Sequence, residues 1–423
     1  MQRLAFRLQV VTPLFLSGAD QQVAELRPPS IRGALRFWFR AMMGGVVGGD
    51  VQKVRQLEAS TWGTTDAASQ LRIRVCDQKL QTFDPTSMKD YEKQRKGLIY
   101  LSFPYLEYEK ELKSQRWNRP YIKPKSSFTV TIRLPSDDAL RAVVEGTVWL
   151  MAHFGGLGGR TRRGFGSVVV DQMQSDRLKP SFLLYQPDPH ADLKDYFEEN
   201  LKVIREAFAT FAQQKLGSHF SAPASGTSPT SVMPQFPSFA DWRTVLIEVL
   251  DSGWKEIMDL SGMKLRHFRE DPSSTARMRW GGQRTFDYMN AVNHFFSGSL
   301  SSPARLDYDV FGLPIQYQSS SRGRAKVSLQ WHYQNDDKLQ DRRASPLIIR
   351  PLKFNGRGKW CIAFHLFRSE FLPKDAIECL VPATDWPSGV SKPSAVDVQV
   401  ARFTKVNAFL DQIKKDYSGV ELL

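Results

Sequence analysis

The sequence predicts an α+β protein, and three observations carry that prediction. Short segments in which every second residue is apolar, typical of half-buried strands, alternate with longer segments whose apolar residues recur every three to four positions, typical of helices. Over roughly the first 180 residues the order of these segments is β-α-β-β-α-β. A 12-residue connection near the end of that stretch, residues 155–166, holds six glycines and three arginines.

The first strand and the first helix are predicted from residues 1–46. Apolar side chains alternate along residues 4–11, and Pro13 ends the strand. Pro28 and Pro29 then block further strand pairing, and Ser30 is expected to cap the helix that follows. The apolar stripe of this helix consists of Ile31, Ala34, Leu35, Trp38 and Met42.

A row of arginines lies on another face of the same helix. Arg32, Arg36 and Arg40 are four residues apart, and Arg27 precedes them. Like charges at this spacing repel each other, and no carboxylate lies between them in the sequence. The row therefore favours an anionic partner, with a solvated basic face as the alternative.

The other elements of the first 180 residues complete the order. Apolar residues alternate along residues 71–75 and 128–134, and Pro135-Ser136 begins a helix whose apolar residues reach Phe154. The last strand is expected over residues 165–170. The β-α-β-β-α-β order is the ferredoxin-like arrangement used by many RNA-binding modules.

The connection over residues 81–126 is long, polar and aromatic. An extra strand is predicted within it, over residues 98–103. Basic residues interleaved with aromatic ones suit a single nucleic-acid strand, while a packed surface loop is equally consistent with the composition. These residues are Arg116, Trp117, Arg119, Tyr121, Lys123 and Lys125.

The glycine-rich loop, residues 155–166, combines permissive backbone with fixed positive charge. Glycines allow another molecule to approach the main chain, and each guanidinium can form a fork with phosphate oxygens. The candidate RNA-binding residues here are Gly156, Gly158, Gly159, Arg160, Arg162, Arg163 and Gly164. The alternative is architectural, because glycine just past a helix end is an ordinary cap.

Two sharper phosphate motifs are excluded by spacing. The loop has neither the G-x-G-x-x-G of dinucleotide-binding folds nor the Lys-Ser/Thr that ends a P-loop. No cofactor is therefore expected.

Composition narrows the class of partner. The 58 basic residues outnumber the 44 acidic ones, which gives a net charge of +14 and favours a polyanion. The cysteines Cys76, Cys361 and Cys379 form no C-x-x-C pair, so neither a disulfide framework nor a structural zinc site is indicated. A reducing cytoplasm fits, and no signal peptide or membrane span is expected.

The second half begins with a helical stretch over residues 183–213, in which Tyr196, Ile204 and Phe208 share a face. Residues 216–240 contain no Asp, Glu, Lys or Arg and form a predicted Ser/Pro-rich linker. Strands are predicted over residues 242–250, 326–331, 347–354 and 359–367, and helices over 285–296 and from Val396 to Tyr417. Its basic residues are Arg322, Arg324, Arg342, Arg343, Arg350, Lys353 and Arg357.

Catalytic residues are not indicated. The seven histidines are scattered, with no H-x-x-x-H pair and no acidic cluster beside them, and His153, late on a predicted helix, is expected to be structural. Asp20, in the loop after the first strand, is the one candidate for metal-assisted cleavage, although loop carboxylates commonly serve turns.

The chain resembles the RAMP superfamily, the repeat-associated subunits of CRISPR effector complexes. Within it, the chain is similar to the first subunit of the Cmr-type (type III-B) effectors. The resemblance lies in residues 12–19, 27–40, 156–166, 311–315 and 342–347.

The resemblance implies a fold and a role. It implies two ferredoxin-like (RRM-like) RAMP domains in tandem, with helical insertions: residues 1–180, a connection over 181–240, and residues 241–423. The role is that of a non-catalytic subunit in antiviral defence, which binds guide RNA and target RNA beside other RAMP subunits and takes no part at a membrane. A RAMP endoribonuclease and a purely structural subunit remain alternatives.

Overall fold

The structure is a computed structural model. It describes residues 1–176, 181–220, 233–270, 294–297, 299, 304–305, 311–312, 315–318, 326–340, 343–370, 372, 375–382, 384, 387–388, 392–399 and 403–422. The chain divides into two compact units. The first is Met1–Met263, Ile348–Ser369 and Ile413–Leu423, and the second is Lys264–Leu347 and Glu370–Gln412. The domain boundaries expected from the sequence stay predictions.

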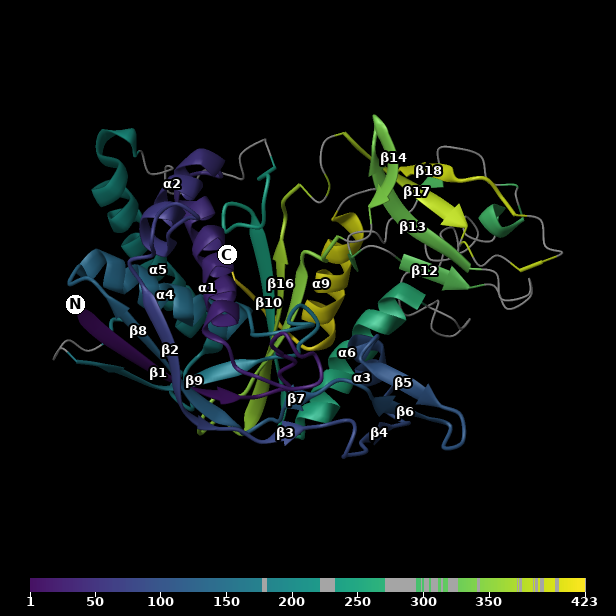
Figure 1. The fold of residues 1–423 in the computed structure, drawn as a ribbon, viewed down its shortest axis with the longest axis horizontal. Helices are drawn as coiled ribbons and strands as arrows, with labels where there is room; N and C mark the ends of the chain where they lie inside the picture. Colours follow the sequence, from purple (N-terminus) through teal and green to yellow (C-terminus); the bar gives the residue numbers. More distant parts are fainter. Residues whose placement is uncertain are drawn as a thin grey trace. The chain divides into compact units, whose positions relative to one another are not determined.

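The first sheet of the first unit has the strand order β2-β8-β1-β9, and its neighbours are antiparallel. Its strands are β1 (Gln2–Val10), β2 (Arg72–Lys79), β8 (Ser127–Leu134) and β9 (Val168–Ser175). Helices α1 (Pro28–Val46) and α4 (Asp138–Phe154) connect them in the predicted alternation. Alternate residues of β1 are fully buried because they face these helices, which lie over one side of the sheet (Figure 1).

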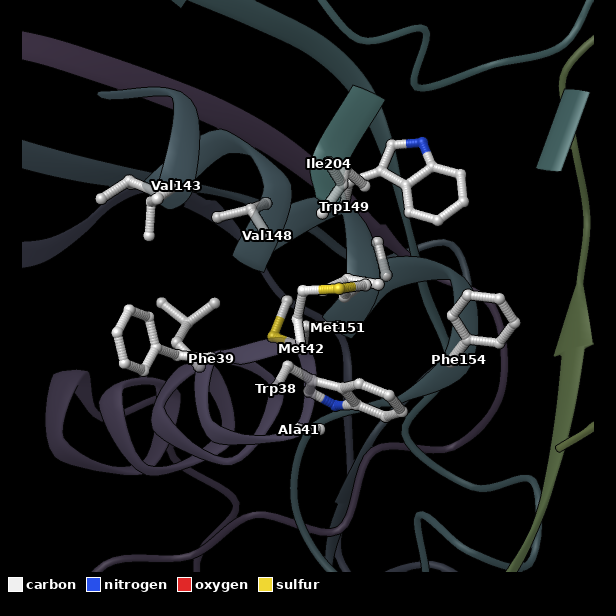
Figure 2. Packing of buried hydrophobic residues seen from close by; sticks show 14 of the residues in the cluster. Trp38, Phe39, Ala41, Met42, Val143, Val148, Trp149, Met151, Phe154 and Ile204 are labelled. Atoms are coloured by element: carbon white, nitrogen blue, oxygen red, sulfur yellow. The ribbon is translucent and has the colours of Figure 1, made fainter. Parts of the chain in front are cut away.

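The core of this unit lies where α1 and α4 meet α5 (Leu193–Leu216). Figure 2 shows Trp38, Phe39 and Met42 of α1 against Val148, Met151 and Phe154 of α4, with Ile204 of α5 beside them. Burial of each side chain of this size contributes about 1.5–3 kcal/mol to the stability of the fold. This cluster therefore holds α1 against α4, the helix that leads into the glycine-rich loop.

The second sheet of the first unit has the order β15-β16-β10-β19. Its strands are β10 (Trp242–Leu250), β15 (Leu347–Leu352), β16 (Lys359–Phe367) and β19 (Val420–Leu422). Along the chain, α6 (Trp254–Glu270) follows β10, and α9 (Thr404–Asp416) precedes β19. The two sheets therefore share one topology: strands second, third, first and fourth in chain order lie side by side.

The second unit contains a further sheet, ordered β11-β18-β17-β13-β12, with β14 paired to β13. The bounds of its strands are β11 (Ala304–Arg305), β12 (Ile315–Gln318), β13 (Lys326–Tyr333), β14 (Asp336–Gln340), β17 (Ala376–Pro382) and β18 (Val396–Gln399). Val327, Leu329 and Leu380 are buried within it.

The connection between β2 and β8 folds into small elements. One small sheet pairs β3 (Thr82–Phe83) with β7 (Tyr121–Ile122). A second sheet has the order β4-β6-β5, with the strands β4 (Tyr91–Glu92), β5 (Leu106–Glu109) and β6 (Ser114–Trp117). The strand predicted over residues 98–103 is wrong, because Lys96–Ser102 is the helix α3. Its first amides, those of Gly97 and Leu98, donate to the Asp259 carboxylate at 2.7 and 3.1 Å. That cap comes from α6 and is invisible in the local sequence.

Other boundaries also differ from the predictions. Helix α1 begins at Pro28 with Arg27 as its N-cap, so Ser30 lies in the first turn and does not cap it. Strand β9 begins at Val168 and not at residue 165, because the glycine-rich loop continues to that point. Val396 lies in strand β18, so the last helix starts only at Thr404.

Helix α6 was not predicted from the sequence, and neither was α2 (Val51–Trp62). Asp50 caps it by accepting from the amides of Gln52 and Lys53, both at 3.0 Å. An Asp before residues of helical periodicity was the available signal. A short 3₁₀ helix, η1 (Gly217–His219), follows α5.

Some predictions fall on residues outside those described. They are residues 221–232 of the linker, most of the helix over 285–296, and Arg322, Arg324 and Arg342. Within the described part of the chain, no helix is both long enough and apolar enough to cross a membrane.

Candidate nucleic-acid interface

The glycine-rich loop lies between α4 and β9, as predicted, and it packs against the residues that follow β1. The amide of Gly159 donates to the carbonyl of Phe15 at 2.7 Å, and the amide of Gly166 to that of Pro13 at 2.9 Å. The hydroxyl of Thr12 donates to the carbonyl of Gly164 at 2.7 Å. The main chain of the loop is thus held against the residues that follow β1.

The glycines of the loop serve this packing. Gly158 and Gly164 have φ of 82° and 87°, a region that L side chains rarely adopt. A Cβ at Gly158 would overlap the Phe15 carbonyl, and a Cβ at Gly159 would overlap the Tyr105 hydroxyl. Gly155 is the C-cap of α4. These contacts favour the architectural alternative for most of the loop.

A strand from the distant second sheet also holds the loop. The main chain of Arg163 pairs with Ile349 of β15, whose amide donates to the Arg162 carbonyl at 3.2 Å. The fully buried Arg350 donates through Nη2 to the carbonyls of Ala152 and Val168, the latter at 2.6 Å. One guanidinium therefore joins the last turn of α4 to the first residue of β9, on both sides of the loop.

Burial lowers the pKa of Arg350 to about 9, so the side chain remains a cation at neutral pH. The carbonyl end of α4 favours a positive charge at this point. From the sequence, Arg350 was only one of several basic residues of the second half. Nothing near it in the sequence indicates its partner Ala152, which lies almost 200 positions away.

The three loop arginines have different surroundings. Arg160 donates from Nε to the carbonyl of Leu101 in α3 at 2.9 Å, and burial lowers its pKa. Arg163 is half-buried beside β15. Arg162 lies with its guanidinium carbon 5.8 Å from the centre of the Phe37 ring, a cation–π distance. Arg160 therefore braces the loop against α3, and Arg162 faces α1.

A pocket of about 400 Å³ lies between the loop, α1 and residues 15–17. The rings of Phe15, Phe37 and Trp38 line it together with Ser30 and Arg162. Aromatic faces, a hydroxyl and one cation are the groups that bind an unstacked base and its phosphate. Of the predicted RNA-binding residues, only Gly156, Gly158, Gly159 and Arg162 line the pocket.

The arginine row of α1 has an internal anion. Arg36 Nε and Arg40 Nη1 both lie 2.7 Å from Glu58 Oε1 of α2, and the Glu58 side chain is only 11% exposed. Arg32 donates to the carbonyl of Leu71 at 3.1 Å. This carboxylate, Glu58, comes from α2, a helix that was not predicted from the sequence. Arg27 is half-buried at the start of α1.

The aromatic residues of the β2–β8 connection point inward. Trp117 and Tyr121 are buried, and their rings lie 5.7 and 5.4 Å from the centre of Phe15. Arg116 lies 3.5 Å from Glu107 and 3.7 Å from Glu109. These aromatic rings therefore belong to a packed loop, which is one of the two alternatives that the composition allowed.

The two residues considered for catalysis both make hydrogen bonds within the protein. His153 is buried, with Nδ1 2.8 Å from the Trp149 carbonyl and Nε2 2.9 Å from the Tyr196 hydroxyl. Burial lowers its pKa to about 3, so it is neutral at physiological pH. Asp20 accepts from the amide of Gln22 at 2.8 Å, as turn aspartates do. Within the described ranges, no three His, Cys, Asp or Glu side chains group in a way that would hold a metal ion.

Comparison with known proteins confirms the resemblance that the sequence indicated. Residues 7–169 match the model of the RAMP superfamily. The chain is 28% identical over 280 residues to the CRISPR system Cmr subunit Cmr1-1 of Pyrococcus furiosus, covering 65% of this chain and 75% of the relative. It is 27% identical over 184 residues to subunit Cmr1-2 of the same organism, covering 41% of this chain and 98% of that one.

The fold is also similar to a solved one. The crystal structure of Cmr1 from Pyrococcus furiosus in its apo form matches with a TM-score of 0.56 at 18% identity, covering 100% of this chain and 98% of that one. The chain therefore has a mixed α+β fold with antiparallel sheets, similar to the fold of that structure.

Proposed function

We propose that this chain is a non-catalytic, RNA-binding subunit of a type III-B CRISPR ribonucleoprotein, equivalent to the Cmr1 subunits that it resembles. Its partners are guide RNA, target RNA and other RAMP subunits, and its place is the cytoplasm, where the free cysteines Cys76, Cys361 and Cys379 stay reduced. The two sheets of common topology are its tandem ferredoxin-like domains.

The relatives support membership of such a complex. Both Pyrococcus furiosus proteins are named as subunits of a CRISPR Cmr system, and the chain covers most of the length of each. The net charge of +14 suits a protein whose neighbours include RNA.

The observation that carries RNA binding is the pocket between the loop and α1. Phe37 and Trp38 present rings to it, and Arg162 contributes the adjacent cation. A base can stack within the pocket while its phosphate meets the guanidinium, and sequence choice is left to base pairing between guide and target. The loop glycines keep the wall of the pocket free of side chains.

A non-catalytic role is supported by His153 and Asp20. RNA cleavage without a metal needs a titratable group close to the attacked phosphate. His153 is buried with both ring nitrogens bonded, and Asp20 is engaged in a turn. Neither residue lines the pocket.

The test is binding of the full chain to labelled single-stranded RNA. The pocket variant, Phe37→Ala with Arg162→Gln, should bind about ten-fold to a hundred-fold more weakly, since each stacked base contributes about 1–3 kcal/mol. Arg55→Gln, an exposed arginine on α2, is the control and should bind as wild type does. Equal affinity of all three proteins would contradict the proposal, and cleavage of the RNA on a gel would favour a ribonuclease.

A further inference from the structure

The face of the first sheet that the helices leave uncovered carries a row of arginines. Arg3 of β1 lies directly opposite Arg133 of β8, and Arg133 lies directly opposite Arg72 of β2. Neighbouring strands are about 4.8 Å apart, so these three residues span roughly 10 Å across the sheet. Arg7 and Arg74 share the face, because they occupy alternate positions of β1 and β2. We call these five residues the arginine face.

The arginine face is open to solvent. All five side chains are exposed, and none makes an ion pair or a hydrogen bond with any residue that the structure describes. The carboxylate of Asp176, just after β9, accepts a hydrogen bond from the main-chain amide of Arg3 at 3.0 Å. The face thus differs from α1, where Glu58 neutralises part of the row.

Such a row is unfavourable in the free protein. Like charges that stand directly opposite each other destabilise an antiparallel pair, and here two such pairs share Arg133. No ion pair or hydrogen bond with a described residue offsets the repulsion between these side chains. A multivalent anion laid across the strands would do so.

The other residues of the face decide which polyanion fits. A depression of about 390 Å³ lies on it, lined by Arg3, Arg7 and Lys79 together with Gln172, Gln174 and one carboxylate, that of Asp77. None of the exposed large hydrophobic residues that the structure describes belongs to these four strands. Protein interfaces have an apolar and aromatic centre, whereas nucleic-acid interfaces are polar and strongly positive. The face therefore suits RNA better than an acidic protein.

We infer that the arginine face binds the phosphates of single-stranded RNA without reading its bases, as a second contact besides the pocket. The inference rests on the proposed function in one respect, namely that the chain works on RNA. Each guanidinium forms a fork with phosphate oxygens. Because the face offers no exposed ring, binding there is indifferent to base identity and strongly dependent on salt.

The experiment measures the binding of three variants of the full chain to labelled oligouridine and to labelled mixed-sequence RNA across a salt series. The face variant is Arg3→Gln with Arg72→Gln and Arg133→Gln. The control variant, Arg55→Gln with Lys110→Gln and Lys202→Gln, removes the same charge from exposed positions elsewhere. The third is the pocket variant. Folding is checked by Tm, which should be unchanged or higher in the face variant because repulsion is removed.

The face variant should bind both RNAs about ten-fold more weakly at low salt, and its plot of log K against log salt should flatten by roughly two units. The control variant should change the slope by less than about half a unit. Equal slopes for the face and control variants overturn the inference.

The remaining outcomes separate this inference from the proposed function. If only the pocket variant weakens binding, the proposed function stands and the arginine face is not an RNA surface. If neither variant weakens binding, both fail. If the face variant binds RNA normally but no longer joins its partner subunits, the face contacts protein and the inference is wrong.

Discussion

The arginines around the glycine-rich loop and those of the arginine face differ in what lies opposite them. Beside the loop, Arg350 donates to two main-chain carbonyls, Arg160 to a third, and Arg36 shares Glu58 with Arg40. On the sheet, Arg3 and Arg133 face each other and the solvent. The same residue type therefore stabilises the fold in one region and remains available to a ligand in the other.

The largest expected difference concerns Arg350. Arg350→Ala should lower the free energy of unfolding by about 2–4 kcal/mol, because two buried carbonyls lose their donor and a cavity opens. Arg72→Ala, on the arginine face, should change it by less than about 0.5 kcal/mol. Urea denaturation of both variants measures this. Similar stabilities would mean that the loop does not depend on Arg350.

Gly158 tests whether the loop glycines are architectural. Gly158→Ala should cost about 2 kcal/mol or more, because a side chain at φ 82° is strained and its Cβ meets the Phe15 carbonyl. Gly33→Ala is the matched control. Gly33 lies in α1 with no atom near its Cβ position, and alanine there should stabilise by about 0.5–1 kcal/mol. Thermal unfolding that ranks the two variants the other way would refute the architectural role.

Acid should weaken the core behind the loop. Burial lowers the pKa of His153 and of His365 to about 3, so between that pH and about 6.5 the unfolded chain binds protons that the folded chain does not. Stability is therefore lost as pH falls, by about 2 kcal/mol for each histidine at about pH 5. His153→Gln should remove about half of this loss in denaturation curves at neutral and acidic pH. The exposed His190→Gln should leave the loss unchanged, and an equal effect of both variants would contradict the assignment.

The smallest effect is expected at Glu58, where a substitution should reduce the difference between the arginines of α1 and those of the arginine face. Glu58→Gln leaves Arg36 and Arg40 without their carboxylate and should cost about 1 kcal/mol. It should also make α1 resemble the arginine face and raise affinity for RNA at low salt. Glu206→Gln, on the exposed side of α5, is the control for the same charge change. No difference between the two variants would show that the α1 arginines do not depend on Glu58.

Local signals in the sequence were enough for most elements of the first sheet. Alternation predicted β1, β2 and β8, helical spacing predicted α4, and the glycines marked the loop between α4 and β9. Helix α3 could not be predicted in the same way, since its cap, Asp259, lies more than 150 positions further along the chain. Helix α2 had a local signal in Asp50 that was not used.

The candidate site was harder to predict because it depends on distant pairs. Arg36 and Arg160 are residues of a type that binds phosphate, but in the fold they contact Glu58 and the Leu101 carbonyl. These partners come from elements whose positions only the fold defines. The arginine face illustrates the opposite case. Arg3, Arg72 and Arg133 occupy outward positions of strands, yet only the strand register shows that they lie in one row.

The most direct test of the difference between the two regions is arginine footprinting. The full chain is treated with phenylglyoxal with and without single-stranded RNA, and modified arginines are identified by mass spectrometry. Arg3, Arg72 and Arg133 should react in the free protein and be protected by RNA, while Arg350 should not react and Arg36 should react slowly in both samples. Equal modification of the arginine face with and without RNA would contradict the account.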